Sequence, residues 1–110
     1  MRAGEYLFVT GQLPVDPETG ELVSDDPAEQ AEQVMRNLET VLREAGTSID
    51  RAVMARIYLV DFEADYPTVN GVYAAHFEQD RYPARTTVGV THLALGAAVE
   101  IDLIVRLSQP

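Results

Sequence analysis

The sequence predicts a single α+β domain in which two helices cover one face of a mixed β-sheet. Two helical segments, at residues 26–46 and 65–80, alternate with stretches that have the two-residue period of strands. A length of 110 residues suffices for one compact domain and is too short for two. The expected element order, β-β-α-β-α-β-β, is typical of one sheet whose helices lie together on one side.

The N-terminal part is expected to begin with a strand at residues 6–10. The stretch at residues 11–20 is rich in proline, glycine and aspartate, which predicts a turn. Residues 21–23 then predict a further short strand. These two strands would be the first pair in the element order.

The clearest helix covers residues 26–46. Asp26 is placed to cap its start, Pro27 suits its first position, and Glu29 completes a capping-box pattern. Gly46 stands where a helix commonly ends. Its apolar residues recur at spacings of three and four and predict one buried face: Ala31, Val34, Met35, Leu38, Val41, Leu42 and Ala45.

The middle of the chain predicts a strand followed by the second helix. Residues 51–62 carry apolar side chains at both alternating sets of positions, so both faces of this strand are expected to be covered. The helix at residues 65–80 contains Gly71, which costs about 1 kcal/mol relative to alanine. We therefore expect another part of the chain to pack closely against Gly71.

The last two strands are expected at residues 86–90 and 99–107. A turn joins them, so they should be neighbours in the sheet. Alternation then places Arg85, Thr87 and Glu100 on the face that is turned away from the core. The same face also carries Met54, Tyr58 and Ile104, a mixture that favours a subunit interface.

Composition excludes several kinds of chemistry. The chain has no cysteine and no lysine, which excludes thiolate nucleophiles and Schiff bases. His76 and His92 lack metal-ligand spacing, so no metal site is expected. A net charge of −10 argues against nucleic-acid binding, and no apolar run is long enough to cross a membrane. A cytoplasmic protein is the expectation.

Arg85 and Glu100 are the candidate site residues, with two interpretations. They predict either a salt bridge at an interface, which contributes little net stability, or a site for a carboxylate ligand. In the second interpretation the planar guanidinium of Arg85 binds the carboxylate, and Glu100 positions a water or accepts its proton. Spacing alone leaves both interpretations open and favours the salt bridge.

The chain resembles the RidA family, also called the YjgF family, of reactive-intermediate deaminases. The resemblance rests on "GQLPVDPETG", "VNGVYAAHF", "PARTTV" and "LGAAVEID" in this order and runs along nearly the whole chain. It implies a chorismate-mutase-like fold and a homotrimer with active sites between subunits. It also implies hydrolysis of 2-imino acids, of the 2-aminoacrylate and 2-iminobutanoate type, to 2-ketoacids and ammonia, without a cofactor.

The resemblance also implies roles for particular residues. Arg85 would bind the substrate carboxylate together with the backbone N–H of Thr87. Glu100 would orient the attacking water. Asn70 would lie near the pocket, and the segment Thr10–Gly11 would line it.

The chain differs from the family in one respect, and two alternative functions remain. Members usually have an N-terminal segment like "PYSQAV", whose tyrosine touches the substrate, so residues 1–110 are expected to be a RidA-like domain without it. The alternatives are a non-catalytic trimer that binds small carboxylates and, less favoured because of the acidic charge, an endoribonuclease.

Overall fold

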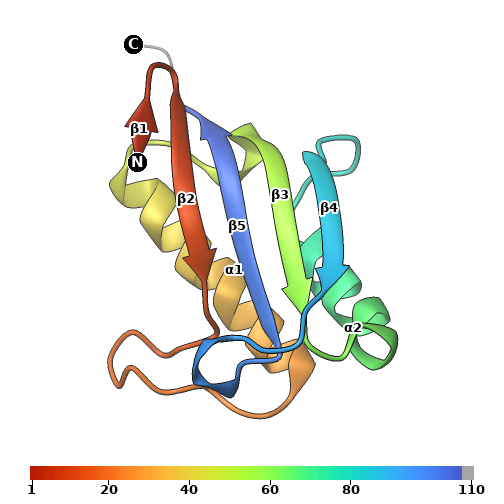
Figure 1. The fold of residues 1–110 in the computed structure, drawn as a ribbon. Coiled ribbons are helices and arrows are strands. Elements are labelled where there is room, and N and C mark those ends of the chain that lie inside the picture. The colour runs from red at the N-terminus through yellow and green to blue at the C-terminus, as the bar shows by residue number, and fades with distance from the viewer. Residues whose placement is uncertain (108–110) are drawn as a thin grey trace.

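A computed structural model of the chain describes residues 1–107. Its helices and strands form one layer of sheet and one layer of helices (Figure 1). Short 3₁₀ turns lie at Ile49–Arg51 and Ala94–Gly96. In chain order the elements are β1 (Arg2–Ala3), β2 (Tyr6–Gln12), α1 (Pro27–Glu44), β3 (Ala52–Leu59), α2 (Phe62–Ala74), β4 (Ala84–Gly89) and β5 (Val99–Arg106).

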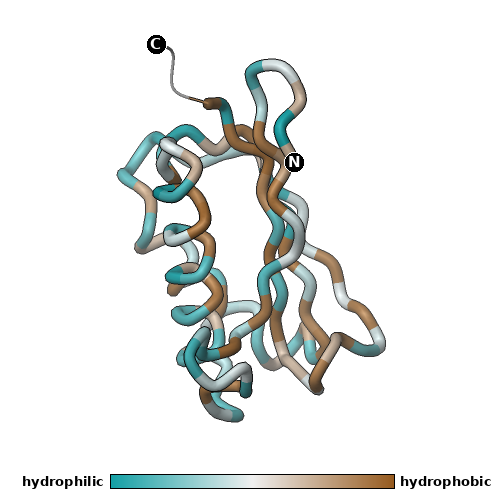
Figure 2. The backbone as a smooth tube through the Cα atoms, turned by 90° about the vertical axis from the view of Figure 1, so that its left-hand side faces the viewer, coloured by the Kyte–Doolittle hydropathy of each residue, from teal (hydrophilic) through white to brown (hydrophobic). Residues whose placement is uncertain are grey.

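The sheet is mixed, with the strand order β1-β2-β5-β3-β4. Strand β5 runs antiparallel to both of its neighbours, β2 and β3, whereas β4 runs parallel to β3. Both helices lie against the same face, as the side view shows (Figure 2). The predicted fold class, a single domain with two helices on one face of a mixed sheet, is therefore confirmed.

The edges of several elements differ from the sequence prediction. Residues 21–23 form no strand, and the only pairing there is an isolated bridge between Val15 and Leu22. The first predicted strand is β2, and the strand that pairs with it in the N-terminal part is β1, which precedes it in the chain. Helix α2 begins at Phe62, three residues earlier than expected, and ends at Ala74.

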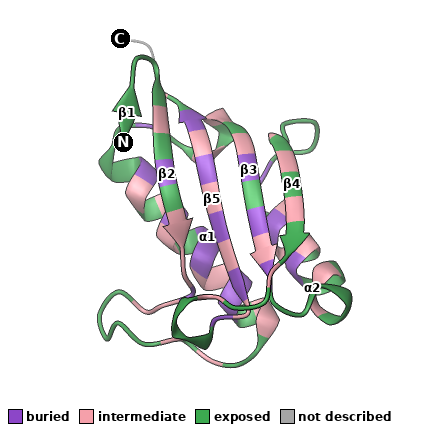
Figure 3. Ribbon diagram, in the orientation of Figure 1, coloured by how far each residue is buried: buried purple, intermediate pink, exposed green. Residues whose placement is uncertain are grey.

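The core lies between the helices and the sheet face that they cover (Figure 3). Helix α1 has the predicted apolar face, although Ala45 at its end is exposed. The strands contribute alternate residues to this core, and the largest fully buried side chains include Met35, Leu38, Leu42, Ile57, Leu59, Ile101 and Leu103. Along β5, buried residues alternate strictly with half-buried or exposed ones, which gives the sheet one covered face and one open face.

The start of α1 is capped, but not by a capping box. The Asp26 side chain accepts a hydrogen bond from the Ala28 N–H, as predicted. The Asp26 N–H, which Glu29 would have to bind in a capping box, donates instead to the Ser24 hydroxyl at 3.1 Å. The turn before the helix therefore replaces the contact expected from Glu29.

The open face of the sheet carries rows of side chains that run across neighbouring strands. One row is apolar and pairs Phe8 with Ile104 and Ile104 with Met54. Phe8 is 44% exposed, which is high for a large apolar side chain. Another row places Glu100 beside Tyr58. The prediction that Met54, Tyr58 and Ile104 share this face is confirmed.

Gly71 lies on the exposed side of α2, and the expectation of close packing there is wrong. A Cβ atom at this position would have nothing within 4 Å. Gly71→Ala is therefore expected to raise the free energy of unfolding by about 0.5–1 kcal/mol, because alanine is the better helix former. Urea denaturation measures this change.

A matched control is available at Gly46, which follows α1. Gly46 has a φ of +81°, so a side chain there is strained although space is free. Gly46→Ala should lower the free energy of unfolding by about 1 kcal/mol or more. A loss of stability in Gly71→Ala would contradict the open environment of that position.

His76, which follows the end of α2, lies between two carboxylates of α1. Its Nε2 atom is 3.1 Å from Glu32 Oε1, and its Nδ1 atom is 3.4 Å from Glu39 Oε2. The hydrogen bond to His76 lowers the pKa of Glu32 below its ordinary value of 4.5, and Arg36 adds to this effect. Ionised Glu32 is therefore stabilised in the folded state.

This contact predicts a pH-dependent contribution to stability. Because the folded pKa of Glu32 is depressed, the contribution is complete above pH 4.5 and is lost as the pH falls through the folded pKa. Glu32→Gln should lower stability at pH 6 by less than about 1 kcal/mol, since Glu32 is partly exposed. The difference from the wild type should shrink toward pH 3 in urea denaturation. A difference that stays constant would contradict the contact.

Candidate functional site

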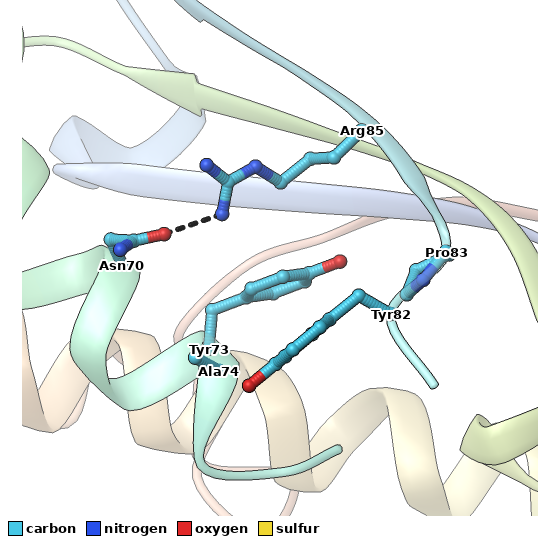
Figure 4. Close-up of a pocket in the computed structure, with 6 residues that line it drawn as sticks. All are labelled: Asn70, Tyr73, Ala74, Tyr82, Pro83 and Arg85. Carbon is cyan, nitrogen blue, oxygen red and sulfur yellow. Dashed lines mark hydrogen bonds between the residues drawn. The ribbon is translucent and has the colours of Figure 1, made fainter. Parts of the chain in front are cut away.

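A cavity of about 340 Å³ lies between α2 and the segment that leads into β4 (Figure 4). The helix contributes an amide, an aromatic ring and a small side chain, and the strand contributes a guanidinium. The cavity is lined by Asn70, Tyr73, Ala74, Tyr82, Pro83 and Arg85. It therefore combines one cation with two tyrosine rings.

Arg85 points toward the helices, not toward the open face as expected. Its register partner on β3 is Ala55, which is fully buried in the core. Side chains of paired residues share a face, so Arg85 must lie on the helix side. There its Nη1 donates to Asn70 Oδ1 at 2.5 Å (Figure 4). Its Nη2 donates to the Tyr66 hydroxyl at 2.9 Å.

Two aromatic rings hold the Arg85 guanidinium in place. Its Cζ atom lies 5.2 Å from the ring centroid of Tyr73 and 5.8 Å from that of Tyr66. The Tyr66 ring in turn stacks on Phe62 with centroids 5.2 Å apart. Contact with ring faces stabilises a cation without neutralising its charge. The guanidinium is therefore fixed in position and still positive.

The charge of Arg85 is not balanced by a carboxylate. Both hydrogen-bond partners are neutral, and within residues 1–107 no acidic side chain forms an ion pair with it. A guanidinium also has more N–H donors than these two bonds use. In a chain with a net charge of −10, an arginine held without an acidic partner is suited to bind a small anion, and its planar donors match a carboxylate.

Tyr73 stays neutral beside this cation. Burial raises the pKa of Tyr73 to about 12, and the nearby charge of Arg85 lowers it only in part. Its hydroxyl is buried without a hydrogen-bond partner among the described residues. The ring therefore contributes an uncharged wall to the cavity.

Thr87 also lies on the helix side, contrary to the prediction. It pairs with Ile57, a core residue, and its hydroxyl is buried without a partner in the part of the chain that the structure describes. The Thr87 backbone N–H, unlike its hydroxyl, is placed to contact a ligand. Val90 donates its N–H to Leu59 O at 2.8 Å, and strand N–H groups alternate in direction. The Thr87 N–H therefore points outward at the free edge of β4, two residues beyond Arg85.

Glu100 lies on the open face, opposite Tyr58, and is separated from β4 by β3. The prediction that Arg85 and Glu100 lie on neighbouring strands and on one face is wrong. Strand β4 joins the edge of the sheet parallel to β3, and the chain then returns to insert β5 between β2 and β3. Within one chain, Arg85 and Glu100 therefore cannot contact the same small ligand.

A second group of predicted residues surrounds Glu100. The Glu100 carboxylate lies over Gly11, where an added Cβ would be only 2.0 Å from Oε2. Any larger residue at position 11 would displace the carboxylate. Burial raises the pKa of Glu100, and the charge of Asp102 raises it further. Thr10 precedes Gly11 at the end of β2 and is exposed.

The structure thus forms two half-sites from the predicted residues. Arg85, Asn70 and the Thr87 backbone lie together at the edge of the sheet, and Glu100 lies with Gly11 on the open face. Within residues 1–107 no three histidine or acidic side chains lie close enough to bind a metal ion. No helix in that range could span a membrane.

Sequence reasoning missed the aromatic residues of the first half-site. Tyr66 and Tyr73 contact Arg85, and Tyr82 lines the cavity beside them. A usable signal was present, because Tyr66, Asn70 and Tyr73 follow the spacing of one helix face. The unknown was which strand that face would cover.

Comparison with known proteins gives the chain a family. A family model described as endoribonuclease L-PSP matches residues 1–107. A RutC family protein of Sinorhizobium fredii is 42% identical over 108 residues, which cover 98% of this chain and 84% of the relative. The chloroplastic Reactive Intermediate Deaminase A of Arabidopsis thaliana is 38% identical over 107 residues, covering 97% of this chain and 56% of the relative.

Solved structures agree with these matches. The crystal structure of E. coli TdcF with bound serine superposes with a TM-score of 0.87 at 31% identity, and the match covers 98% of this chain and 85% of TdcF. The resemblance to RidA proteins is confirmed by these relatives. The chain belongs to the endoribonuclease L-PSP family, which includes the reactive intermediate deaminases.

Proposed function

We propose that this protein is a cofactor-independent hydrolase that converts 2-imino acids to 2-ketoacids and ammonia. Its substrates would be small imino acids of the 2-aminoacrylate and 2-iminobutanoate type. The observation that carries the proposal is the Arg85 guanidinium, which is held by neutral groups and has donors left for a carboxylate. The deaminase among the relatives supports the reaction type.

In the proposed mechanism, the substrate carboxylate binds the remaining donors of Arg85 and the outward N–H of Thr87. Asn70 and Tyr66 keep the guanidinium in place. Glu100 accepts a proton from a water, and the water oxygen adds to the imine carbon. Glu100 returns that proton to the nitrogen of the tetrahedral intermediate, the hydroxyl group gives up its proton, and the C–N bond breaks to release ammonia and leave the 2-ketoacid. A protonated imine is already electrophilic, so anchoring and one positioned water are sufficient.

The proposal requires more than one copy of the chain. Arg85 and Glu100 lie on opposite faces of one sheet, so a complete site would combine Arg85 of one protomer with Glu100 and the Thr10–Gly11 segment of another. The exposed apolar residues on the open face, such as Phe8, supply a reason to associate. We therefore propose a homotrimer with its sites at subunit interfaces.

A second candidate function is binding of small carboxylates without turnover. The serine bound to TdcF favours it, because an amino acid has the carboxylate that Arg85 is suited to bind. The endoribonuclease activity in the family's description is less well supported here. A net charge of −10 repels a phosphate backbone, and other arginines, such as Arg56, are already paired with carboxylates.

Two substitutions are expected to separate catalysis from binding. Arg85→Ala should lower kcat/KM by about 100-fold or more, because the substrate is no longer oriented. Glu100→Gln should lower kcat by about 10²–10⁴-fold and leave affinity for a 2-ketoacid nearly unchanged. An amino-acid oxidase or dehydratase generates the imine, and the protein's turnover is measured as suppression of semicarbazone formation.

Arg36→Gln is the matched control, since Arg36 forms an exposed ion pair with Glu32 on α1 and does not line the Arg85 cavity. It should behave like the wild type. If the wild-type protein binds a 2-ketoacid but does not suppress the semicarbazone signal, the deaminase function is overturned and the binding function is supported. Wild-type protein that does neither would overturn both functions.

Tyr66 is expected to matter through its hydroxyl. Tyr66→Phe keeps the ring beside Arg85 but removes the hydrogen bond to Nη2. Loss of a hydrogen bond to a charged group costs about 1.5–3 kcal/mol, so KM should rise roughly 10-fold or more. Steady-state kinetics with the imine as the varied substrate measures this. An unchanged KM would show that Asn70 and the rings suffice to hold Arg85.

A further inference from the structure

On the open face, the carboxylate of Asp102 accepts two hydrogen bonds from its neighbours. Asp102 on β5 accepts a hydrogen bond from Arg56 Nε at 2.9 Å and another from the Tyr58 hydroxyl at 3.1 Å. Both donors come from β3, the adjacent strand. The Asp102 side chain is only 13% exposed, whereas Arg56 is 56% exposed. These contacts form a network that no step of the proposed mechanism uses.

Glu100 is the nearest carboxylate to this network. It precedes Asp102 by two residues on β5, so both side chains lie on the same face with Cα atoms about 7 Å apart. Glu100 pairs with Tyr58 and Asp102 pairs with Arg56. On the other side, the segment 10–12 of β2 offers no titratable side chain. The charged and titratable groups that face Glu100 on the sheet are therefore Asp102, Arg56 and Tyr58.

The two carboxylates differ in their hydrogen bonds. Asp102 accepts hydrogen bonds from two donors, one of them a cation. Glu100 has no donor within residues 1–107 and lies over the bare backbone of Gly11. A carboxylate that accepts no hydrogen bond is a more available proton acceptor than one whose oxygens are already occupied by donors.

We infer that Asp102, held in place by Arg56 and Tyr58, is a positioning residue that makes Glu100 the proton acceptor of the pair. This role rests on the proposed function and deepens it. The fixed negative charge of Asp102 favours transfer of a water proton to Glu100, and Arg56 limits the effect by partly compensating that charge. Burial acts on Glu100 in the same direction as Asp102.

The inference predicts opposite shifts from two substitutions. Asp102→Asn removes the negative charge, so the acidic limb of the pH profile of kcat/KM should move to lower pH. Arg56→Gln leaves the charge of Asp102 uncompensated, so the same limb should move to higher pH. Asp102→Glu restores the charge and should return the limb toward the wild-type position. A purely structural role would lower activity without moving the limb in opposite directions.

A second measurement does not depend on turnover. Protein labelled with ¹³C at the glutamate side-chain carboxyl carbon allows Glu100 to be titrated by NMR, with its signal assigned from Glu100→Gln. Its midpoint should fall in Asp102→Asn and rise in Arg56→Gln, with Arg36→Gln as the unchanged control. Gel filtration of each variant checks that assembly is preserved.

The outcomes distinguish the two proposals. Opposite shifts of the Glu100 titration midpoint support the inference even if the wild type shows no turnover. Missing turnover by itself would overturn only the deaminase function. Coincident midpoints in the wild type and both variants, or shifts in one direction, would overturn the inference. If the wild type is active and the Glu100 titration midpoint is the same in the variants, the deaminase function is retained and Asp102 has no role in its mechanism.

Discussion

The parallel pairing of β3 with β4 is the constraint on which the rest of the site depends. Parallel neighbours cannot be joined by a tight turn, so the chain must cross over the sheet between them, and α2 is that crossover. The crossover places α2 directly over the face of β4 that carries Arg85. Asn70 and Tyr66 then lie within hydrogen-bond distance of the guanidinium. The half-site is a consequence of this connection.

Two arginines on adjacent strands show how surroundings decide what a cation does. Arg56 on β3 forms an ion pair with Asp102, so a carboxylate balances its charge. Arg85 on β4 faces the opposite side and meets only amide, hydroxyl and aromatic groups. The chain carries 18 acidic residues, yet within residues 1–107 none of them forms an ion pair with Arg85. Neutral partners fix the guanidinium and preserve its attraction for an anion.

Much of the fold was predictable from local sequence because local rules decide it. The cap at Asp26 and the alternation along β5 each depend on neighbours in the chain. The order of strands was not predictable in this way. Consecutive strands are neighbours in most sheets, and that regularity led to the wrong pairing of Arg85 with Glu100. Inserting β5 between β2 and β3 depends on contacts between distant segments, which no local pattern records.

The same topology explains why the candidate residues divide into two half-sites that one chain cannot unite. Three strands carry the open-face groups, with Gly11 on β2, Glu100 on β5 and Tyr58 on β3 side by side. The candidate anion-binding group, Arg85, lies at the outer edge, on the helix side of β4. A ligand that needs both an anchor for its carboxylate and a proton acceptor must therefore lie where the edge of one sheet meets the open face of another. Covering the exposed apolar residues of that face, such as Phe8, would bring the two halves together, so the drive to bury surface and the requirement for a complete site point to the same assembly.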